Sequence, residues 1–269
     1  MSELQVGVIG AYGRMGRMVI QCVIEQEGCR LVAASDHFGC PGIGKDAGEV
    51  AGLGTLGVSI SDHTESVFQD SDVVIDFTLP EPSLRHVKMA IESGKPLVIG
   101  TTGIDDAGKA IIKKAAKKVP IVHAPNFSVG VNLMFKVAAE MAKTLGEEVD
   151  IEVIEAHHRH KVDAPSGTAL RLGESIAQAT GRSLDAHGVF SRHGDTGERN
   201  RADIGFATVR GGDIVGDHTA MFAGDGERLE ITHRASSRIL FAKGALRAAL
   251  WVVEKKPGLY DMQDILGFR

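Results

Sequence analysis

Residues 5–16 read QVGVIGAYGRMG, and this stretch decides the fold of the first half of the chain. Its apolar start predicts a short buried strand that opens directly into Gly10, Gly13 and Gly16. A helical pattern and a second buried strand follow, and Asp36 closes that strand twenty residues beyond Gly16. This order of strand, glycine turn, helix, strand and acid is the fingerprint of a dinucleotide-binding fold. The glycines let the backbone approach a pyrophosphate at the helix N-terminus, and the acid accepts hydrogen bonds from ribose hydroxyls.

The spacing of these glycines departs from the common GxGxxG form, because two residues stand between Gly10 and Gly13. A glycine triplet alone is also compatible with a plain turn, but the flanking strands and Asp36 favour a cofactor site. The acid favours NADH because it repels a 2′-phosphate, whereas Arg14 either offsets that repulsion or is simply a solvated helix residue. The sequence therefore predicts NADH or NADPH, without a preference. The turn residues predicted to contact the cofactor are Gly10, Ala11, Tyr12, Gly13, Arg14 and Met15.

The strands and helices that follow predict a Rossmann-like, doubly wound parallel sheet. Buried strands over 73–77, 96–100 and 121–124 alternate with helical patterns. Ligands of such α/β sheets bind beyond the carboxyl ends of the strands, so the turns there are candidate contacts for the nicotinamide and its ribose, with ordinary loop capping as the alternative. These candidates are Gly100, Thr101, Thr102, Ala124, Pro125, Asn126 and Phe127. Residues 39–60 are glycine-rich and read as a long loop or flap of unassigned role.

A second stretch, EAHHRHKVDAPSGT at 155–168, gathers cationic and titratable side chains. Imidazoles titrate near neutral pH, where proton transfer is useful. The stretch ends in a Pro-Ser-Gly-Thr turn before a helical pattern, which suits an anion. It therefore predicts a site that binds a carboxylate-bearing substrate and moves a proton, the alternative being a solvated basic loop. No metal site is predicted, because Arg159 and Lys161 would repel a cation and no Cys or acid cluster completes the set.

The pattern changes after Asn126, and the second half predicts an α+β domain. Helical patterns cover 129–145 and 168–180, with a strand over 149–156 between them. Later β-rich runs are broken by glycine turns at 211–213 and 225–226, both of which suit hairpins. We therefore expect a second, mostly antiparallel sheet.

Composition limits the possible partners and location. A net charge of −5 argues against general nucleic-acid binding, which needs a basic surface. Cys22, Cys29 and Cys40 form an odd, sparse set that suits a reducing cytosol. No apolar run approaches the ~18 residues of a membrane span, and no signal peptide is evident. We expect a soluble cytoplasmic protein with no membrane partner.

Four motifs together resemble the bacterial dihydrodipicolinate reductase family: GAYGRMGR at 10–17, GTTG at 100–103, APNFSVGVN at 124–132 and EAHHRHKVDAPSGTA at 155–169. The resemblance covers essentially the whole chain. It implies NAD(P)H-dependent reduction of 4-hydroxy-tetrahydrodipicolinate, a cyclic dicarboxylic imine, with loss of water, in the diaminopimelate route to lysine. It also implies a homotetramer. The implied segments are a dinucleotide-binding domain over 1–126, a substrate-binding and oligomerisation domain over 127–235, and a C-terminal segment over 236–269 that returns to the first domain.

The resemblance also implies roles for individual residues. His157 matches the family's proposed proton donor, and Lys161 matches its catalytic or carboxylate-anchoring lysine. Residues that match the substrate pocket are His158, Ser166, Gly167 and Thr168. Which histidine gives up the proton stays open, as do the roles of Arg159 and His160. Two alternatives are another Rossmann dehydrogenase of amino-acid metabolism and a non-catalytic dinucleotide sensor, but a sensor has no need of a proton donor beside an anion pocket.

Overall fold

The computed structural model describes residues 3–269, which divide into two compact units. The first unit runs to Ser128 and includes Arg238–Arg269, and the second is Val129–Ser237. These limits lie two residues beyond the segment boundaries expected from the sequence.

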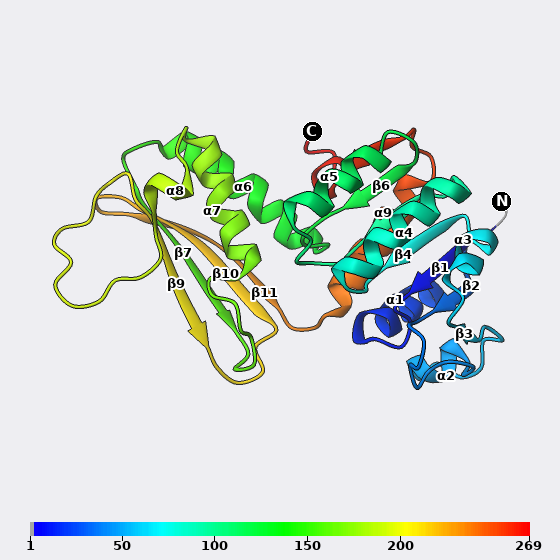
Figure 1. Cartoon of the computed structure of the whole chain (residues 1–269). Coiled ribbons are helices and arrows are strands. Elements are labelled where there is room, and N and C mark those ends of the chain that lie inside the picture. Colours follow the sequence, from blue (N-terminus) through cyan, green and yellow to red (C-terminus); the bar gives the residue numbers. More distant parts are fainter. Residues whose placement is uncertain (1–2) are drawn as a thin grey trace. The chain divides into compact units, whose positions relative to one another are not determined.

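The first unit is built on a seven-stranded sheet in the order β12-β6-β5-β4-β1-β2-β3, in which every strand pair is parallel. The predicted Rossmann-like fold is therefore confirmed, with helices on both sides of the sheet (Figure 1). The strands are β1 (Leu4–Ile9), β2 (Cys29–Ser35), β3 (Ile60–Ser61), β4 (Val73–Asp76), β5 (Leu97–Ile99), β6 (Pro120–His123) and β12 (Gly258–Tyr260). The helices are α1 (Arg14–Glu25), α2 (Ala47–Ala51), α3 (Thr64–Asp70), α4 (Pro80–Ser93), α5 (Asp106–Ala115), α9 (Ile239–Val252) and α10 (Met262–Ile265).

Two apolar layers bury the faces of this sheet. On one side, Val6 and Val8 of β1 pack with Val19 of α1 and Ala245 of α9. The other side packs against α3, α4 and α5. The C-terminal segment completes the first unit, because β12 pairs with β6 and α9 packs against α1.

The glycine turn joins β1 to α1 through close backbone contacts. Gly10 has φ of +80°, a conformation that favours glycine. A Cβ on Gly16 would lie 2.0 Å from the Gly10 carbonyl oxygen, so only glycine lets the helix approach the strand so closely.

The glycine-rich stretch over 39–60 is not one structureless loop, and this expectation was wrong. It contains α2, and Asp46 organises it by accepting hydrogen bonds from the backbone N–H groups of five residues. This single carboxylate supplies local order that hydrophobic periodicity does not signal. The donors are Gly48, Glu49, Leu56, Gly57 and Val58.

The second unit packs two long helices against one face of a five-stranded sheet. Ile151 and Val153 of the sheet pack with Met134 of α6 and Leu172 of α7. The helices are α6 (Val129–Leu145), α7 (Gly167–Ala179) and α8 (Leu184–His187). The strands are β7 (Asp150–His157), β8 (Gly188–Val189), β9 (Ile204–Arg210), β10 (Gly216–Ala223) and β11 (Arg228–Ala235).

This second sheet is mixed rather than mostly antiparallel. Its order is β11-β10-β7-β9-β8, with two antiparallel pairs followed by two parallel pairs. The turn at 225–226 joins a β10–β11 hairpin as predicted, but the turn at 211–213 does not join a hairpin. The central strand β7 lies between β9 and β10 and bonds to both, a long-range pairing that turn residues cannot reveal.

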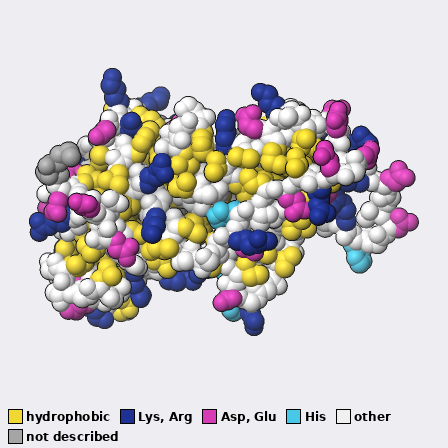
Figure 2. Space-filling model, turned by 180° about the vertical axis from the view of Figure 1, so that it is seen from behind, with side chains coloured by type: hydrophobic (Ala, Val, Ile, Leu, Met, Phe, Trp, Pro, Cys, Tyr) yellow, Lys and Arg dark blue, Asp and Glu magenta, His cyan; other side chains and the backbone are white. Residues whose placement is uncertain are grey.

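The surface mixes charges of both signs. On the face drawn in Figure 2, Lys and Arg side chains are scattered among Asp and Glu. Within the described chain, no helix is both long and apolar enough to cross a bilayer.

The Gly16 contact generates a first prediction. Gly16→Ala should destabilise the protein by ~3 kcal/mol, because the methyl group meets backbone that cannot move aside. In Gly13→Ala, the new Cβ lies 3.2 Å from the same Gly10 oxygen, so the cost should be ~1 kcal/mol. Urea unfolding of both variants measures the difference, and equal stabilities would contradict this account of the turn.

Candidate active site

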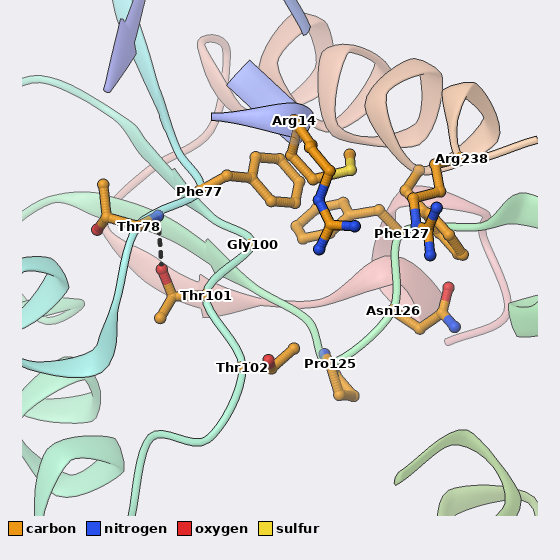
Figure 3. A pocket seen from close by; sticks show the side chains of 12 residues that line it. Arg14, Phe77, Thr78, Gly100, Thr101, Thr102, Pro125, Asn126, Phe127 and Arg238 are labelled. Atoms are coloured by element: carbon orange, nitrogen blue, oxygen red, sulfur yellow. Dashed lines mark hydrogen bonds between the residues drawn. The ribbon is translucent and has the colours of Figure 1, made fainter. Parts of the chain in front are cut away.

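A cavity of about 480 Å³ lies in the first unit, beyond the carboxyl ends of the parallel strands (Figure 3). The residues that line it are Arg14, Met15, Phe77, Thr78, Gly100, Thr101, Thr102, Pro125, Asn126, Phe127, Arg238 and Phe241. Eight of these were predicted cofactor contacts. The other predicted contacts form the turn before α1 (Gly10 to Gly13), the end of β2 (Asp36) and a buried position after β6 (Ala124).

Sequence reasoning missed two cavity residues from the C-terminal segment, Arg238 and Phe241. Arg238 directly precedes α9, and its side chain joins Arg14 in giving the cavity a cationic lining (Figure 3). Phe77 and Phe127 add apolar walls, with ring centroids 6.0 Å apart. Sequence patterns could not identify Arg238 and Phe241 as cavity residues, because α9 returns to the sheet more than a hundred residues after the other cavity loops.

A buried carboxylate, Asp76 at the end of β4, holds the Thr78 wall of the cavity in place. It accepts hydrogen bonds from the Thr78 N–H at 2.9 Å and hydroxyl at 2.7 Å, and from the Ser83 hydroxyl at 2.7 Å. His86 Nδ1 lies 2.8 Å from Asp76 Oδ2, the same oxygen that accepts the Ser83 hydroxyl. The Thr78 N–H also lies 3.2 Å from Thr101 Oγ1, so two neighbouring loops are fixed together.

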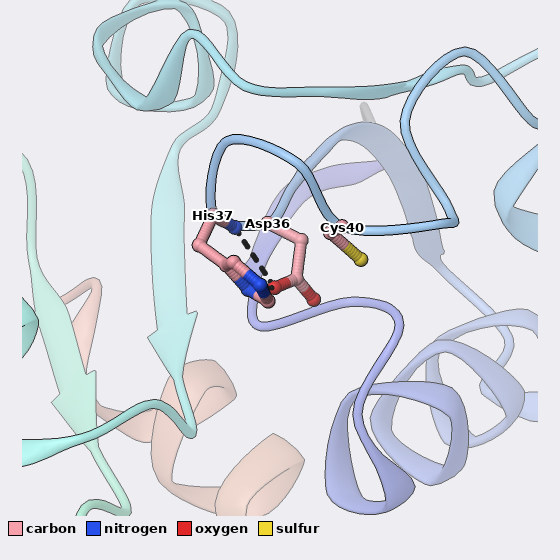
Figure 4. A group of neighbouring side chains, drawn as sticks. All are labelled: Asp36, His37 and Cys40. Atoms are coloured by element: carbon pink, nitrogen blue, oxygen red, sulfur yellow. Dashed lines mark hydrogen bonds and ion pairs between the residues drawn. The ribbon is translucent and has the colours of Figure 1, made fainter.

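Asp36 plays a similar part at the glycine turn. Its Oδ2 accepts the Tyr12 N–H at 2.9 Å, and its Oδ1 accepts the His37 N–H at 2.8 Å. Cys40 lies beside this pair, and one candidate ligand atom from each of the three residues lies within 4.8 Å of the others (Figure 4). Because His37 Nδ1 already lies 2.8 Å from Asp36, we interpret the group as a polar network at the ribose end of the site rather than as a metal site.

The first unit fits a dinucleotide. Helix α1 has no acidic residue in its first turn and no side-chain cap, so its N-terminal N–H groups are available to a pyrophosphate. Gly13, directly before the helix, has no side chain that could block a ligand at that end. Asp36 retains lone pairs for a ribose hydroxyl.

In the second unit, the centre of the predicted proton-transfer site is Glu155, a residue to which sequence reasoning gave no role. Its carboxylate is 1% exposed and receives Arg210 in a two-pronged ion pair, at 2.7 Å and 2.8 Å. It also accepts the Ser166 N–H at 3.1 Å and lies 2.6 Å from His157 Nδ1. Burial raises the pKa of Glu155, but the bonds from Arg210, His157 and Ser166 outweigh it and bring that pKa below its ordinary value.

The imidazole of His157 is buried on the same face of β7, because residues two apart on a strand share a face. Burial lowers its pKa, and the bond to Glu155 opposes that shift only in part. An ionised carboxylate can only accept hydrogen bonds, so the neutral ring carries its hydrogen on Nδ1, and Nε2 is the unprotonated nitrogen. Gly216 makes room for the ring, since a Cβ there would lie 3.0 Å from Nε2.

A second histidine, His218 on β10, was also missed. Its register partner is Glu155, and its ring meets the His157 ring edge-on with centroids 5.0 Å apart. His218 Nε2 lies 3.0 Å from the Ser166 hydroxyl. Burial lowers the pKa of His218 to about 3, and the nearby His157 adds to that shift.

The Ser-Gly-Thr turn is the start of α7, as an anion-binding turn requires. The Ser166 hydroxyl caps the helix by accepting the Ala169 N–H at 3.1 Å. A Cβ on Gly167 would meet nothing within 4 Å, so open space adjoins the first helical position. Thr168 is the second helical residue, so it lies in the first turn of α7.

The cationic residues between His157 and Ser166 form an outer layer. Lys161 Nζ contacts both oxygens of Asp163, at 2.7 Å and 2.9 Å. The Lys161 side chain is about one-fifth exposed. The His158 N–H donates to the Ile214 carbonyl, and the His158 ring lies 6.2 Å from that of His160. Arg159 and His160 are exposed.

The buried His218 generates a prediction about pH. Its folded-state pKa of about 3 lies below the ordinary 6.5, so it stabilises the fold above pH 6.5 and this contribution is lost as pH falls toward 3. When the pH falls from 7 to 5, the free energy of unfolding should therefore fall by about 2 kcal/mol less in His218→Gln than in the unmutated chain. Urea unfolding at both pH values tests this, and identical losses would contradict the buried, neutral state of His218.

Comparisons with known proteins identify the family of this chain. The family model described as "Dihydrodipicolinate reductase, N-terminus" matches residues 4–127, and "Dihydrodipicolinate reductase, C-terminus" matches residues 130–266. A curated protein of Magnetococcus marinus, named 4-hydroxy-tetrahydrodipicolinate reductase, is 59% identical over 99% of both chains.

Two solved structures share the fold of this chain. The dipicolinate-bound dihydrodipicolinate reductase from Paenisporosarcina sp. TG-14 has a TM-score of 0.77 and 26% identity, covering 97% of this chain and 98% of its own. An amine dehydrogenase from Mycobacterium smegmatis, with a TM-score of 0.61, 14% identity and coverage of 96% and 94%, shares the fold alone. The family resemblance is thus confirmed over both units, and the chain belongs to the dihydrodipicolinate reductase family.

Proposed function

We propose that this chain reduces 4-hydroxy-tetrahydrodipicolinate to tetrahydrodipicolinate with NADH or NADPH, releasing water, in the diaminopimelate route to lysine. One observation carries the proposal: a buried imidazole and an anion-binding helix start are held by the same carboxylate, Glu155. A planar ring with two carboxylates that must gain a proton suits such a site. A relative whose structure holds dipicolinate, a planar dicarboxylate, supports this choice of substrate.

The first unit would hold the cofactor. The N-terminal N–H groups of α1 and the Arg14 guanidinium suit the pyrophosphate, and Asp36 suits the adenosine ribose. The loops at Gly100 to Thr102 and Ala124 to Phe127 suit the nicotinamide half. When bound, the cofactor supplies a hydride to C4 of the dehydrated substrate. Arg14, in the first turn of α1, would offset the repulsion between Asp36 and a 2′-phosphate, so neither cofactor is excluded.

The second unit would hold the two carboxylates of the substrate. One fits the open space beside Gly167, where the N-terminal end of the α7 dipole favours an anion. The other fits Lys161, a point charge that would exchange Asp163 for the substrate. His158 and the Ser166 hydroxyl are further pocket residues in this proposal.

His157 would supply the proton to C3. In the free protein burial keeps its pKa low, so the ring is neutral near pH 7. Two substrate carboxylates nearby would favour the imidazolium, because opposite charges stabilise one another at short range. The proton then sits on Nε2, the nitrogen that does not face Glu155.

This division of roles predicts a split in kinetics. His157→Asn should lower kcat by ~10²-fold, the scale of general acid catalysis.

Gly167→Ala should raise KM on the order of tenfold with the fold intact, because its methyl group fills space meant for a carboxylate. Lys161→Ala should lose mainly kcat, with some loss of affinity. The assay follows oxidation of NADH and NADPH with the condensation product of pyruvate and aspartate semialdehyde.

Two results would contradict these proposals. Absence of turnover in the unmutated chain would contradict the proposed reaction. Unchanged turnover in both His157→Asn and Lys161→Ala would contradict the roles proposed for these two residues. Inhibition by 2,6-pyridinedicarboxylate, a planar dicarboxylate that cannot be reduced in this way, provides an independent check on the substrate site.

We further propose a homotetramer assembled through the face of the second sheet opposite α6 and α7. That face carries half-buried residues with little charge at its centre: Ile154, Ala156, Thr219 and Met221. A second copy of the same face suits it, because like small and apolar residues can pack together. Ile154→Arg should then yield smaller particles in light scattering after gel filtration. An unmutated chain that is monomeric at micromolar concentration would contradict the proposal.

A cytoplasmic location fits a reaction that consumes NAD(P)H. Cys22, Cys29 and Cys40 are all free thiols, as expected in a reducing compartment. Fractionation of cells that produce the chain would test this location.

A further inference from the structure

We propose that Glu155 is a positioning residue for the reduction: it fixes the tautomer of His157 and ties that ring to the carboxylate-binding turn at Ser166. The proposal rests on the function proposed above and extends it to a residue outside the substrate pocket. Glu155 is buried under the sheet face and acts through its neighbours.

Every lone pair of this carboxylate faces a donor. Oε2 lies 2.6 Å from His157 Nδ1 and accepts Arg210 Nη1 at 2.7 Å. Oε1 accepts Arg210 Nη2 at 2.8 Å, the Ser166 N–H at 3.1 Å and the Thr208 hydroxyl at 3.3 Å. The Arg210 guanidinium and the Ser166 N–H can only donate, so they favour the ionised form of Glu155, and beside an ionised carboxylate His157 Nδ1 keeps its hydrogen.

The consequence for chemistry is directional. With Nδ1–H committed to Glu155, only Nε2 can take up and give away a proton. The opposite tautomer would place a lone pair against a carboxylate oxygen 2.6 Å away, which is repulsive. Glu155 also stabilises the imidazolium once it forms, as an orienting carboxylate does for a catalytic histidine in general.

The second consequence concerns the distance between the His157 ring and the start of α7. The carboxylate that orients the His157 ring also holds the backbone N–H of Ser166, the residue that caps α7. Arg210 adds a third attachment, because its Nη2 also donates to the Asp163 carbonyl at 2.7 Å. The segment from His157 to Ser166 is thus fixed at three points around one buried charge. The proton donor and the anion-binding turn cannot move independently, and errors near 1 Å in such positions are costly to catalysis.

Strand β7 offers a matched control three residues earlier. Glu152 also forms a two-pronged pair with an arginine, Arg192, at 2.9 Å and 3.0 Å, and it accepts Arg199 at 3.1 Å. Glu152 lies on the opposite face of the strand, and its bonds lead to no histidine and no helix start. Glu152→Gln therefore changes the same charge on the same strand without touching His157 or the start of α7. Because Glu152 shares a face with Ile154, light scattering must first show that this variant keeps the oligomeric state of the unmutated chain.

The experiment compares Glu155→Gln, Glu155→Asp and Glu152→Gln in the full chain. Glu155→Gln should lower kcat by ~10²-fold. In either orientation of the new amide, its NH2 group faces another donor, so the side chain no longer enforces the Nδ1–H tautomer of His157. NADH affinity, read from fluorescence, should stay within twofold. The pH above which kcat declines should move down, since the imidazolium loses its carboxylate. Glu155→Asp should recover part of kcat, and Glu152→Gln should match the unmutated chain.

A second measurement reads the tautomer in the unmutated protein itself. ¹⁵N NMR of histidine-labelled, unmutated protein, assigned with His157→Asn, should show the Nδ1–H tautomer of His157 above its pKa. An Nε2–H tautomer would overturn the proposal. So would a Glu155→Gln variant whose kcat and pH profile match those of Glu152→Gln, or one whose loss of kcat leaves the pH profile unmoved. Lack of turnover in the unmutated chain would instead overturn the proposed function, and the tautomer would still report on Glu155.

Discussion

A single buried negative charge organises the second unit of this protein. Removing Glu155 from water is costly, and the structure offsets that cost with the Arg210 fork and with donors from three other residues. Those donors come from β7, β9 and the start of α7, so the charge joins elements that are distant in sequence. The position of the His157 ring and of the Ser166 turn both follow from this one requirement.

The first unit uses the same physical device. Asp36, at the end of β2, accepts the N–H of Tyr12 and so fixes the glycine turn before α1. Asp76, at the end of β4, fixes Thr78 before α4. In each case a carboxylate at a strand end holds backbone that precedes a helix. Rigid placement of both partners is what a hydride and proton transfer requires.

How much of this is visible in the sequence depends on how local each feature is. The glycine turn, Asp36 and the parallel sheet were predictable because strand, turn and helix signals are adjacent. Glu155 was within reach as well, since strand alternation places it on the same face as His157. Arg210 and His218 were not, because the register that puts them opposite His157 and Glu155 is set by pairing across fifty or more residues. The mixed sheet escaped prediction for the same reason: a strand inserted between two others leaves no turn signal.

Neutron diffraction from crystals of the free protein near pH 7, exchanged into deuterium oxide, would test the central claim most directly, because it locates the hydrogens between Glu155 and its partners. The account predicts a deuteron on His157 Nδ1, none on either Glu155 oxygen, and full occupancy of the two Arg210 positions that face the carboxylate. A deuteron on Glu155, or a bare His157 Nδ1, would contradict it.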